Sequence, residues 1–217
     1  MEITYLGHSA FKLKGKQGTV ITDPYPTDIG LSMGSVSADI VTISHQHADH
    51  NAVKHVSGTA RREKPWVADS AGEYEVSGIS VFGYQSFHDE KQGEERGRNI
   101  IYSIIIDGVN VVHLGDLGHN LSQEMIEKLG NVDVLLCPVG GKFTIDPKVA
   151  TEVIQAIEPY FVIPMHYKTA KHGSHFAQLA TLEDFEKVYG VHADPVKSLN
   201  VTSATMPEQT TLVVLEN

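Results

Sequence analysis

The chain has 217 residues, of which 41% are hydrophobic and 20% are charged, a composition typical of globular rather than disordered proteins. Its formal net charge of −10 argues against bulk electrostatic binding to nucleic acid or to an anionic membrane. A single cysteine, Cys137, excludes an internal disulfide, and 12 histidines prompt a search for metal ligands. We expect one domain over residues 1–217.

The chain shows no targeting or membrane signal. Residues 1–16 contain no apolar region of a signal peptide, and no run of about 18 apolar residues occurs. The single cysteine, which we expect in the core, suits a reducing compartment. We therefore expect a cytoplasmic protein with a small-molecule substrate and with neither a nucleic-acid nor a membrane partner. Its oligomeric state is not predicted.

The first half of the chain is predicted to be rich in strands. Short β-branched and apolar runs bounded by turn residues predict strands over residues 3–6, 10–13, 19–22, 40–43 and 79–84. The clearest element is a hairpin over residues 100–114. Its turn, Asp107 and Gly108, suits type I′ geometry, because glycine accepts a positive φ.

The second half alternates helices and strands. Apolar residues at helical spacing and capping residues, Asn120 and Asp146 among them, predict helices over residues 121–129, 147–157 and 181–189. Short apolar runs over residues 132–136, 161–163 and 211–215 predict further strands. The pattern indicates sheets covered by helices in a layered α/β or α+β domain, and it leaves the topology open.

A cluster of metal-ligand residues follows the run at 40–43. Three imidazoles and a carboxylate lie within six residues, His45 to His50. On an extended segment His45 and His47 point the same way, so they can hold one metal ion, whereas Asp49 and His50 face a neighbouring position. The alternative is a solvated or helix-capping cluster. Metal binding is favoured, because charged imidazoles this close would repel one another.

Three more residues have the position expected of metal ligands. His88, Asp116 and His166 each come directly after an apolar, strand-like run. Strand ends that meet at one rim form the usual site in layered α/β folds. We therefore expect these side chains to join the cluster.

In this pattern the sequence resembles the metallo-β-lactamase superfamily. The matching marks, in order, are Asp23, His45-x-His47-x-Asp49-His50, His88, Asp116 and His166. Residues 7–11, 138–141 and 163–167 are most similar to its small single-domain branch of metal-dependent hydrolases, which includes the ascorbate-6-phosphate lactonase-like proteins.

The resemblance implies a fold and a ligand set. The fold is a four-layer αββα sandwich of the α/β (α+β) class, with two divalent metal ions at one edge. The implied ligands are His45, His47 and His88 for the first ion, Asp49, His50 and His166 for the second, and Asp116 for both. Asp23 would steady the ligand loop by hydrogen bonds. Histidine and aspartate suit Zn²⁺, while Mn²⁺, Fe²⁺ and Ni²⁺ stay open.

The implied chemistry is hydrolysis. Two metal ions about 3.5–4 Å apart share a hydroxide and direct it at a carbonyl or phosphoryl group. The sequence thus predicts a dinuclear hydrolase of a small ester, lactone or phosphodiester, with Asp49 as a catalytic residue that passes a proton to the leaving group. The alternative is a metal-binding module, or a superfamily nuclease with little small-molecule hydrolysis. The net charge of −10 disfavours the nuclease.

Three residues outside the ligand set are candidates for substrate binding. His119 follows the loop of Asp116, and Tyr167 follows His166. Lys142 follows two glycines, where a cation suits a phosphate or carboxylate of the substrate. Each of the three has a plain surface role as its alternative.

The remaining polar segments have no committed role in the chemistry. His8 is interpreted as stabilising a turn, with an approach to the site as the alternative, and His113 as structural. The charged segment 89–98, with Arg96 and Arg98, reads as a solvated loop, although it starts beside a predicted ligand and part of it is a candidate cover for the site.

Overall fold

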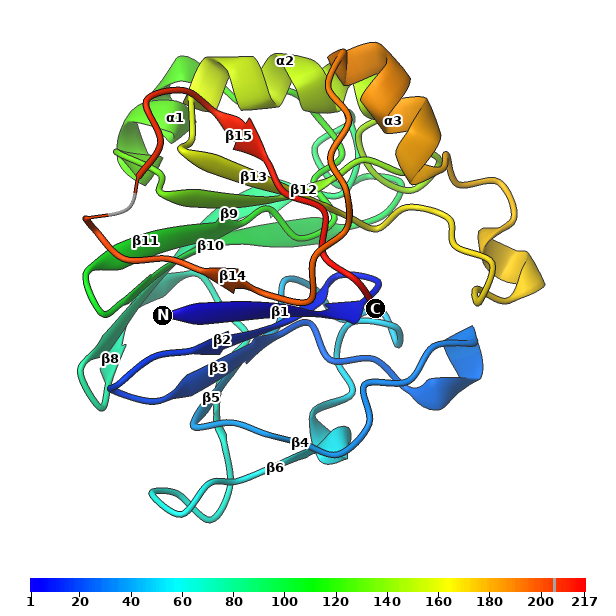
Figure 1. Ribbon diagram of the computed structural model, residues 1–217. Helices are drawn as coiled ribbons and strands as arrows, with labels where there is room; N and C mark the ends of the chain where they lie inside the picture. The colour runs from blue at the N-terminus through cyan, green and yellow to red at the C-terminus, as the bar shows by residue number, and fades with distance from the viewer. Residues whose placement is uncertain (205) are drawn as a thin grey trace.

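Two mixed β-sheets lie face to face in the computed structural model, which describes residues 1–204 and 206–217 (Figure 1). The first sheet has the order β14-β1-β2-β3-β5-β7 and the second β15-β13-β12-β11-β10-β9-β8. The strands of the first sheet are β1 (Glu2–Gly7), β2 (Ala10–Lys14), β3 (Thr19–Thr22), β5 (Ile40–Thr42), β7 (Trp66–Ala68) and β14 (Leu199–Asn200). Those of the second are β8 (Gly72–Val76), β9 (Ile79–Phe87), β10 (Arg98–Ile106), β11 (Val109–His113), β12 (Val134–Pro138), β13 (Phe161–Met165) and β15 (Thr211–Leu212).

The α-helices of the described residues cover the outer face of the second sheet (Figure 1). They are α1 (Gln123–Leu129), α2 (Pro147–Ile157) and α3 (Leu182–Tyr189). The outer face of the first sheet carries a strand pair, β4 (Val36–Ser37) and β6 (Val56–Ser57), and the 3₁₀ helix η2 (Val53–His55). Their apolar cluster includes Ile21, Val41 and Val56. The αββα class is confirmed, with a fourth layer built of short, irregular segments rather than α-helices.

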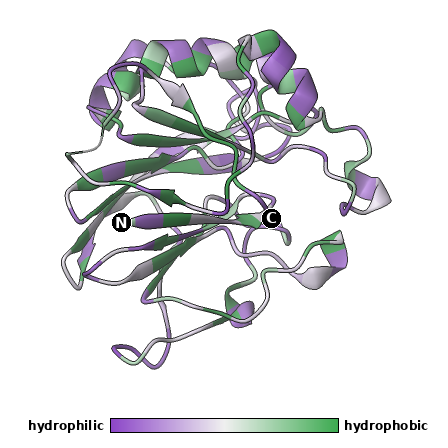
Figure 2. Ribbon diagram, viewed as in Figure 1, coloured by the Kyte–Doolittle hydropathy of each residue, from purple (hydrophilic) through white to green (hydrophobic). Residues whose placement is uncertain are grey.

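The main core lies between the two sheets and beneath the helices. In β1 the buried side chains alternate with partly exposed ones, as in a strand with one face toward the core. Phe11, Tyr102 and Ile104 are fully buried in the main core cluster. Along α2 the buried residues recur at helical spacing, so this helix is held by its apolar face, and Figure 2 shows apolar strands with polar residues on the outer helices.

Most predicted elements are confirmed. The hairpin turn has φ 54° at Asp107 and 75° at Gly108, as type I′ geometry requires. The helix over 147–157 is present, with the Asp146 carboxylate accepting the N–H groups of Lys148 and Val149. The first helix differs from the prediction, because Ser122, and not Asn120, accepts the capping hydrogen bond. The short strands β7, β8 and β14 were not predicted from the sequence.

The strand directions place the C-terminal ends of six strands at a common edge of the two sheets. β1 and β3 are each antiparallel to β2, and β5 is parallel to β3, so β1, β3 and β5 run the same way. The same holds for β9, β11 and β13 in the second sheet. Within three residues of the ends of these six strands lie His8, Asp23, His45, His88, Asp116 and His166. At the same edge, on the right of Figure 1, lie the 3₁₀ helices η1 (Thr27–Ile29, blue) and η3 (Ser174–Phe176, orange-yellow). Among the described residues no helix is both long and apolar enough to cross a bilayer.

Candidate metal centre

Two groups of imidazoles meet at this edge. In the first, ligand atoms of His45, His47 and His88 all lie within 4.8 Å of one another. In the second, those of His50 and His166 lie equally close together, and they are joined by His8. The groups adjoin, since the ring centroids of His45 and His50 are 4.2 Å apart.

The Asp116 carboxylate lies between the two groups. Its Oδ2 is 3.3 Å from Nε2 of His50, of His88 and of His166, and 3.8 Å from Nε2 of His45. Burial alone would raise the pKa of Asp116, but the neighbouring His166 and His50 hold it well below its usual range. An ionised carboxylate with nitrogens of both groups around it is placed to serve two metal ions.

Hydrogen bonds fix the orientation of two of the rings. The Asp23 carboxylate accepts the Nδ1–H of His50 at 3.0 Å and the backbone N–H of Ser44 at 2.7 Å. The Ser44 hydroxyl donates to Asp23 and accepts from Nδ1 of His45. In both histidines Nδ1 is therefore engaged and Nε2 faces the centre. A hydrogen-bond partner behind a ring fixes its tautomer and orientation in this way in metal sites. Asp23 thus contacts the ligand loop as the family resemblance implies.

The donor set fits a divalent cation. Nε2 of His45, Nε2 of His50 and Oδ1 of Asp116 are buried and have no hydrogen-bond partner among the described residues. Burial lowers the pKa of His45 to about 3, so its imidazole is neutral at pH 7 and its lone pair is available. Burial also lowers the pKa of His50, but the charges of Asp116 and Asp23 outweigh it, so that the pKa is raised. The pocket therefore favours positive charge, and a metal ion would supply it.

His8 lies at this centre, which the sequence analysis gave only as the alternative to a turn-stabilising role. Its ring is fully buried, 4.3 Å from the ring of His166, and its Nε2–H donates to Asp49 Oδ2 at 3.2 Å. Burial lowers the pKa of His8 to about 3. The available signal was its place after the first strand, which it shares with the predicted ligands. His113 is structural as expected, because Gly115 donates to its Nδ1 and its Nε2–H donates to the carbonyl of Ser9.

Three of the eight described non-glycine residues with a positive φ lie at the centre. His8, Asp23 and His166 have φ of 56°, 37° and 53°, in the left-handed region that non-glycine residues seldom adopt. Such residues persist where the surrounding structure holds them, and they are frequent at functional sites.

Asn99 and Gly115 position Asp116. Asn99 is fully buried, and its side-chain oxygen accepts the Asp116 N–H at 3.0 Å. Gly115 has φ 58°, and a Cβ there would come within 2.4 Å of the Asn99 side-chain oxygen. The turn that presents Asp116 therefore needs a glycine.

Two cavities open beside the cluster. The first, of about 360 Å³, is lined by His47, Asp49, His88, Asp116 and His166, together with Arg96, Phe143, His175 and Phe176. The second, of about 520 Å³, shares His47 and Arg96 with the first and extends past Ser70 and Gln85. Volumes of this size suit small-molecule ligands.

The three predicted substrate residues lie in different surroundings. Lys142 is exposed, and it lines a hollow that also contains His88 and Arg96. His119 lines neither cavity. Both of its ring nitrogens are engaged with the backbone instead, since the Phe87 N–H donates to Nε2 and Nδ1–H donates to the Asn120 carbonyl. Tyr167 is only 7% exposed and packs into the main core. Among the residues that follow His166, it is His175 and Phe176 that line the 360 Å³ cavity.

The charged segment after His88 is a largely solvent-exposed loop, as expected, and its backbone is organised around one buried carboxylate. The buried Asp89 carboxylate accepts the backbone N–H groups of Lys91, Gly93, Glu95 and Arg96. Burial would raise the pKa of Asp89, but these four donors lower it. The loop closes where the His88 N–H donates to the Gly97 carbonyl, and it brings Arg96 to the cavities.

Comparison with known proteins agrees with this fold and this site. The profile of the Beta-lactamase superfamily domain matches residues 2–166, so the chain belongs to that superfamily. A UPF0173 metal-dependent hydrolase of Methanospirillum hungatei is 33% identical, and the match covers 78% of this chain and 84% of the relative. One from Thermococcus onnurineus is 28% identical over 90% of this chain and 95% of its own.

Within the superfamily, the chain is a member of the UPF0173 metal-dependent hydrolase family. A crystal structure from Thermotoga maritima, described as a candidate zinc-dependent hydrolase of the metallo-β-lactamase superfamily, is 36% identical to it. The two superpose with a TM-score of 0.79 over 99% of this chain and 97% of the other. Family and fold thus agree with the metal centre built from the strand ends.

Proposed function

We propose that this chain is a dinuclear metal-dependent hydrolase. His45, His47 and His88 would hold one ion, Asp49, His50 and His166 the other, and Asp116 both. The observation that carries the proposal is the position of Asp116 Oδ2, 3.3 Å from Nε2 of His50, His88 and His166. These nitrogens come from both groups, and a shared carboxylate is the feature that a two-metal site needs.

When bound, such a pair of ions activates water and polarises the carbonyl or phosphoryl group under attack. The side chains of the protein prepare the reaction. Asp23 and Ser44 hold the rings of His50 and His45. Asp49 faces the cavity, and although burial would raise its pKa, the hydrogen bond from His8 keeps it lowered. We assign to this carboxylate the transfer of a proton from the attacking water to the leaving group.

The proposed substrate is a small ester, lactone or phosphodiester. The 360 Å³ cavity beside the cluster supports a small molecule rather than a polymer. The net charge of −10 disfavours a nucleic-acid substrate. The resemblance to ascorbate-6-phosphate lactonase-like proteins supports a lactone among the candidates. The histidine-rich donor set supports Zn²⁺, with Mn²⁺, Fe²⁺ and Ni²⁺ as alternatives.

Metal content is the first test. Untagged protein purified without chelators or added metal is expected to contain about two divalent ions per chain by elemental analysis. Asp116→Ala should lose metal and hydrolysis, and His47→Ala should do so with less risk to folding, because His47 is exposed. His192→Ala is the matched control, since that ring is exposed and pairs with Glu186. Absence of metal after zinc or manganese is added back, or unchanged hydrolysis in His47→Ala, would refute the proposal.

A further inference from the structure

We infer that the substrate carries a negatively charged group, a phosphate or a carboxylate, apart from the bond that is cleaved, and that the Arg96 guanidinium binds it. This inference rests on the proposed function, because it names the class of molecule that the same site would hydrolyse. It depends on three features of Arg96: its lack of an ion-pair partner, its support by an aromatic ring and its place between two cavities.

The Arg96 guanidinium lacks a counter-charge within the protein. Across residues 1–204 and 206–217 it forms no ion pair. Two of the four acids of its own loop are engaged elsewhere, and the other two, Glu90 and Glu94, are exposed. Both oxygens of Asp89 accept backbone N–H groups, and Glu95 pairs with Lys91 at 2.5 Å. In a chain of net charge −10, a cation left unpaired at a cavity wall is available to an anionic ligand.

An aromatic ring supports the guanidinium from one side. The Cζ of Arg96 lies 4.9 Å from the centroid of the Phe143 ring. This contact stabilises the flat group by a cation–π interaction and leaves the N–H groups at its edge free for a ligand. Phe143 also stacks against His175 at 5.6 Å, so the support is itself part of a packed wall. Arg96 is therefore held in place before a ligand arrives.

The position of Arg96 relates the anion to the metal centre. Arg96 lines the cavity that contains His88, Asp116 and His166, and it also lines the neighbouring 520 Å³ cavity. A ligand that binds Arg96 therefore reaches the metal centre without leaving the 360 Å³ cavity. The neighbouring cavity contains Asp69 as well as Arg98, so its own charges partly offset each other. The wall shared by the two cavities is the better place for an anion.

Electrostatics also favours an anion at this wall. A guanidinium close to two divalent cations repels them, and in a partly buried cavity this repulsion is only weakly screened. A negative group of the ligand, held between Arg96 and the metal centre, is attracted to both and so replaces this repulsion by attraction.

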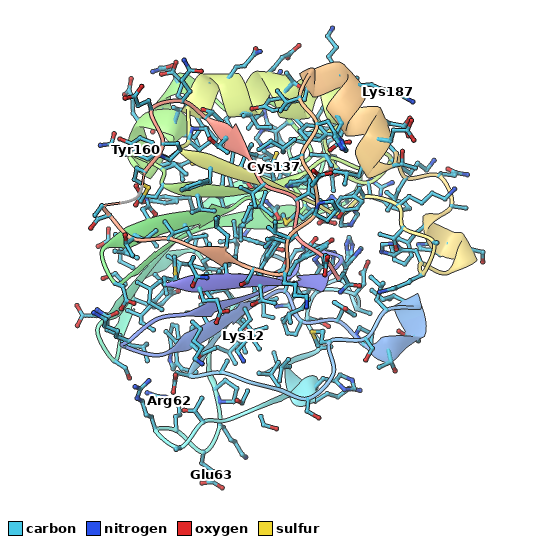
Figure 3. All side chains as sticks on the ribbon, viewed as in Figure 1. Lys12, Arg62, Glu63, Cys137, Tyr160 and Lys187 are labelled. Carbon is cyan, nitrogen blue, oxygen red and sulfur yellow. The ribbon has the colours of Figure 1, made fainter. Side chains whose placement is uncertain are left out.

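The experiment compares two substrates that differ in one charge. Metal-loaded wild type and Arg96→Gln are assayed with mono-4-nitrophenyl adipate and with its neutral methyl ester. We expect Arg96→Gln to raise KM for the anionic ester about 10- to 100-fold and to leave KM for the neutral ester within about twofold. Arg62→Gln is the matched control. It removes the same charge from the loop before β7 (Figure 3). Because β7 runs parallel to β5, this loop lies at the end of the first sheet away from His45.

A binding measurement separates the two proposals. Inorganic phosphate and succinate are titrated into the metal-loaded proteins by calorimetry, and Arg96→Gln should weaken the tighter of the two about 10-fold or more. Which anion binds more tightly distinguishes phosphate from carboxylate. If the wild type hydrolyses neither ester, the ester form of the proposed function fails, and the calorimetry still decides on the anion site. Equal losses for both esters, or equal anion affinity in wild type and Arg96→Gln, would overturn the inference.

Discussion

Replacing Asp23 by asparagine should weaken the metal site without altering a ligand. The asparagine oxygen can still accept the Ser44 N–H, which the carboxylate accepts at 2.7 Å. Its NH₂ group then faces the Nδ1–H of His50, where a donor meets a donor. His50 must shift its proton to Nε2 or turn its ring, and either change removes the lone pair that faces Asp116. The backbone tolerates the change, because asparagine accepts the φ of 37° at this position.

The expected size of the effect follows from the loss of this one partner. Removing the hydrogen-bond partner behind a ligating histidine costs about 10- to 100-fold in metal affinity, or about 1.4–2.8 kcal/mol. His50 belongs to the second group of ligands, so the loss should fall mainly on one of two ions. Asp23→Asn is therefore expected to retain about one tight metal ion per chain.

Competition with a chromogenic chelator measures the affinity, and elemental analysis measures the content. Asp39→Asn is a suitable control. Asp39 is also buried, and it accepts the Thr19 N–H at 2.8 Å, but it precedes β5 and thus lies at the opposite end of the strand from His45. We expect it to lower thermal stability with unchanged metal affinity. Wild-type affinity for both ions in Asp23→Asn, or equal weakening in Asp39→Asn, would contradict the reasoning.

Three further outcomes are expected. Burial raises the pKa of the Cys137 thiol, so this thiol should stay unmodified by a thiol reagent at pH 8 until the chain unfolds. Rapid labelling of the native protein would contradict its buried place in the second sheet (Figure 3). Phe185→Ala should lower the free energy of unfolding in urea by about 3–5 kcal/mol, because the ring is fully buried, and a loss below about 1 kcal/mol would argue against that packing. Asp89→Ala should speed amide hydrogen exchange over residues 89–97, since four N–H groups lose their acceptor. It should also reduce turnover of the anionic ester while the metal content stays unchanged. Unaltered exchange would show that other contacts hold the loop.

The parts of the fold that were predictable have strong local signals. The turn at Asp107 and Gly108 needs a particular backbone conformation, and the Asp146 cap with Pro147 defines a helix start. The short strand β7 has only three residues, too few for a period to be recognised. Its position is decided by pairing with β5, from the distant segment 40–42.

The site was partly predictable for the same reason. Ligand-type residues directly after apolar runs, such as His88 and His166, are visible in the sequence. His8 has the same local context, but its role depends on the end of β1 lying beside the end of β13, where the His166 N–H donates to the His8 carbonyl. The loop of Arg96 was predicted to be solvated, with part of it as a candidate cover for the site. The position of Arg96 was not predictable, because the hydrogen bonds that fold the loop go from one carboxylate to backbone groups and leave no pattern of residue types.

The left-handed backbone at His8, Asp23 and His166 sets function against stability in this chain. Each position adds about 1–3 kcal/mol of local strain for a residue that is neither glycine nor asparagine. These residues come directly after β1, β3 and β13, where the chain leaves each strand beside the candidate metal centre. Selection for thermal stability alone, in the presence of a chelator, should therefore enrich glycine or asparagine at these positions and yield more stable proteins that bind metal more weakly. Selection for hydrolysis should remove the same substitutions. Selection for stability and selection for activity therefore favour different residues at these three positions.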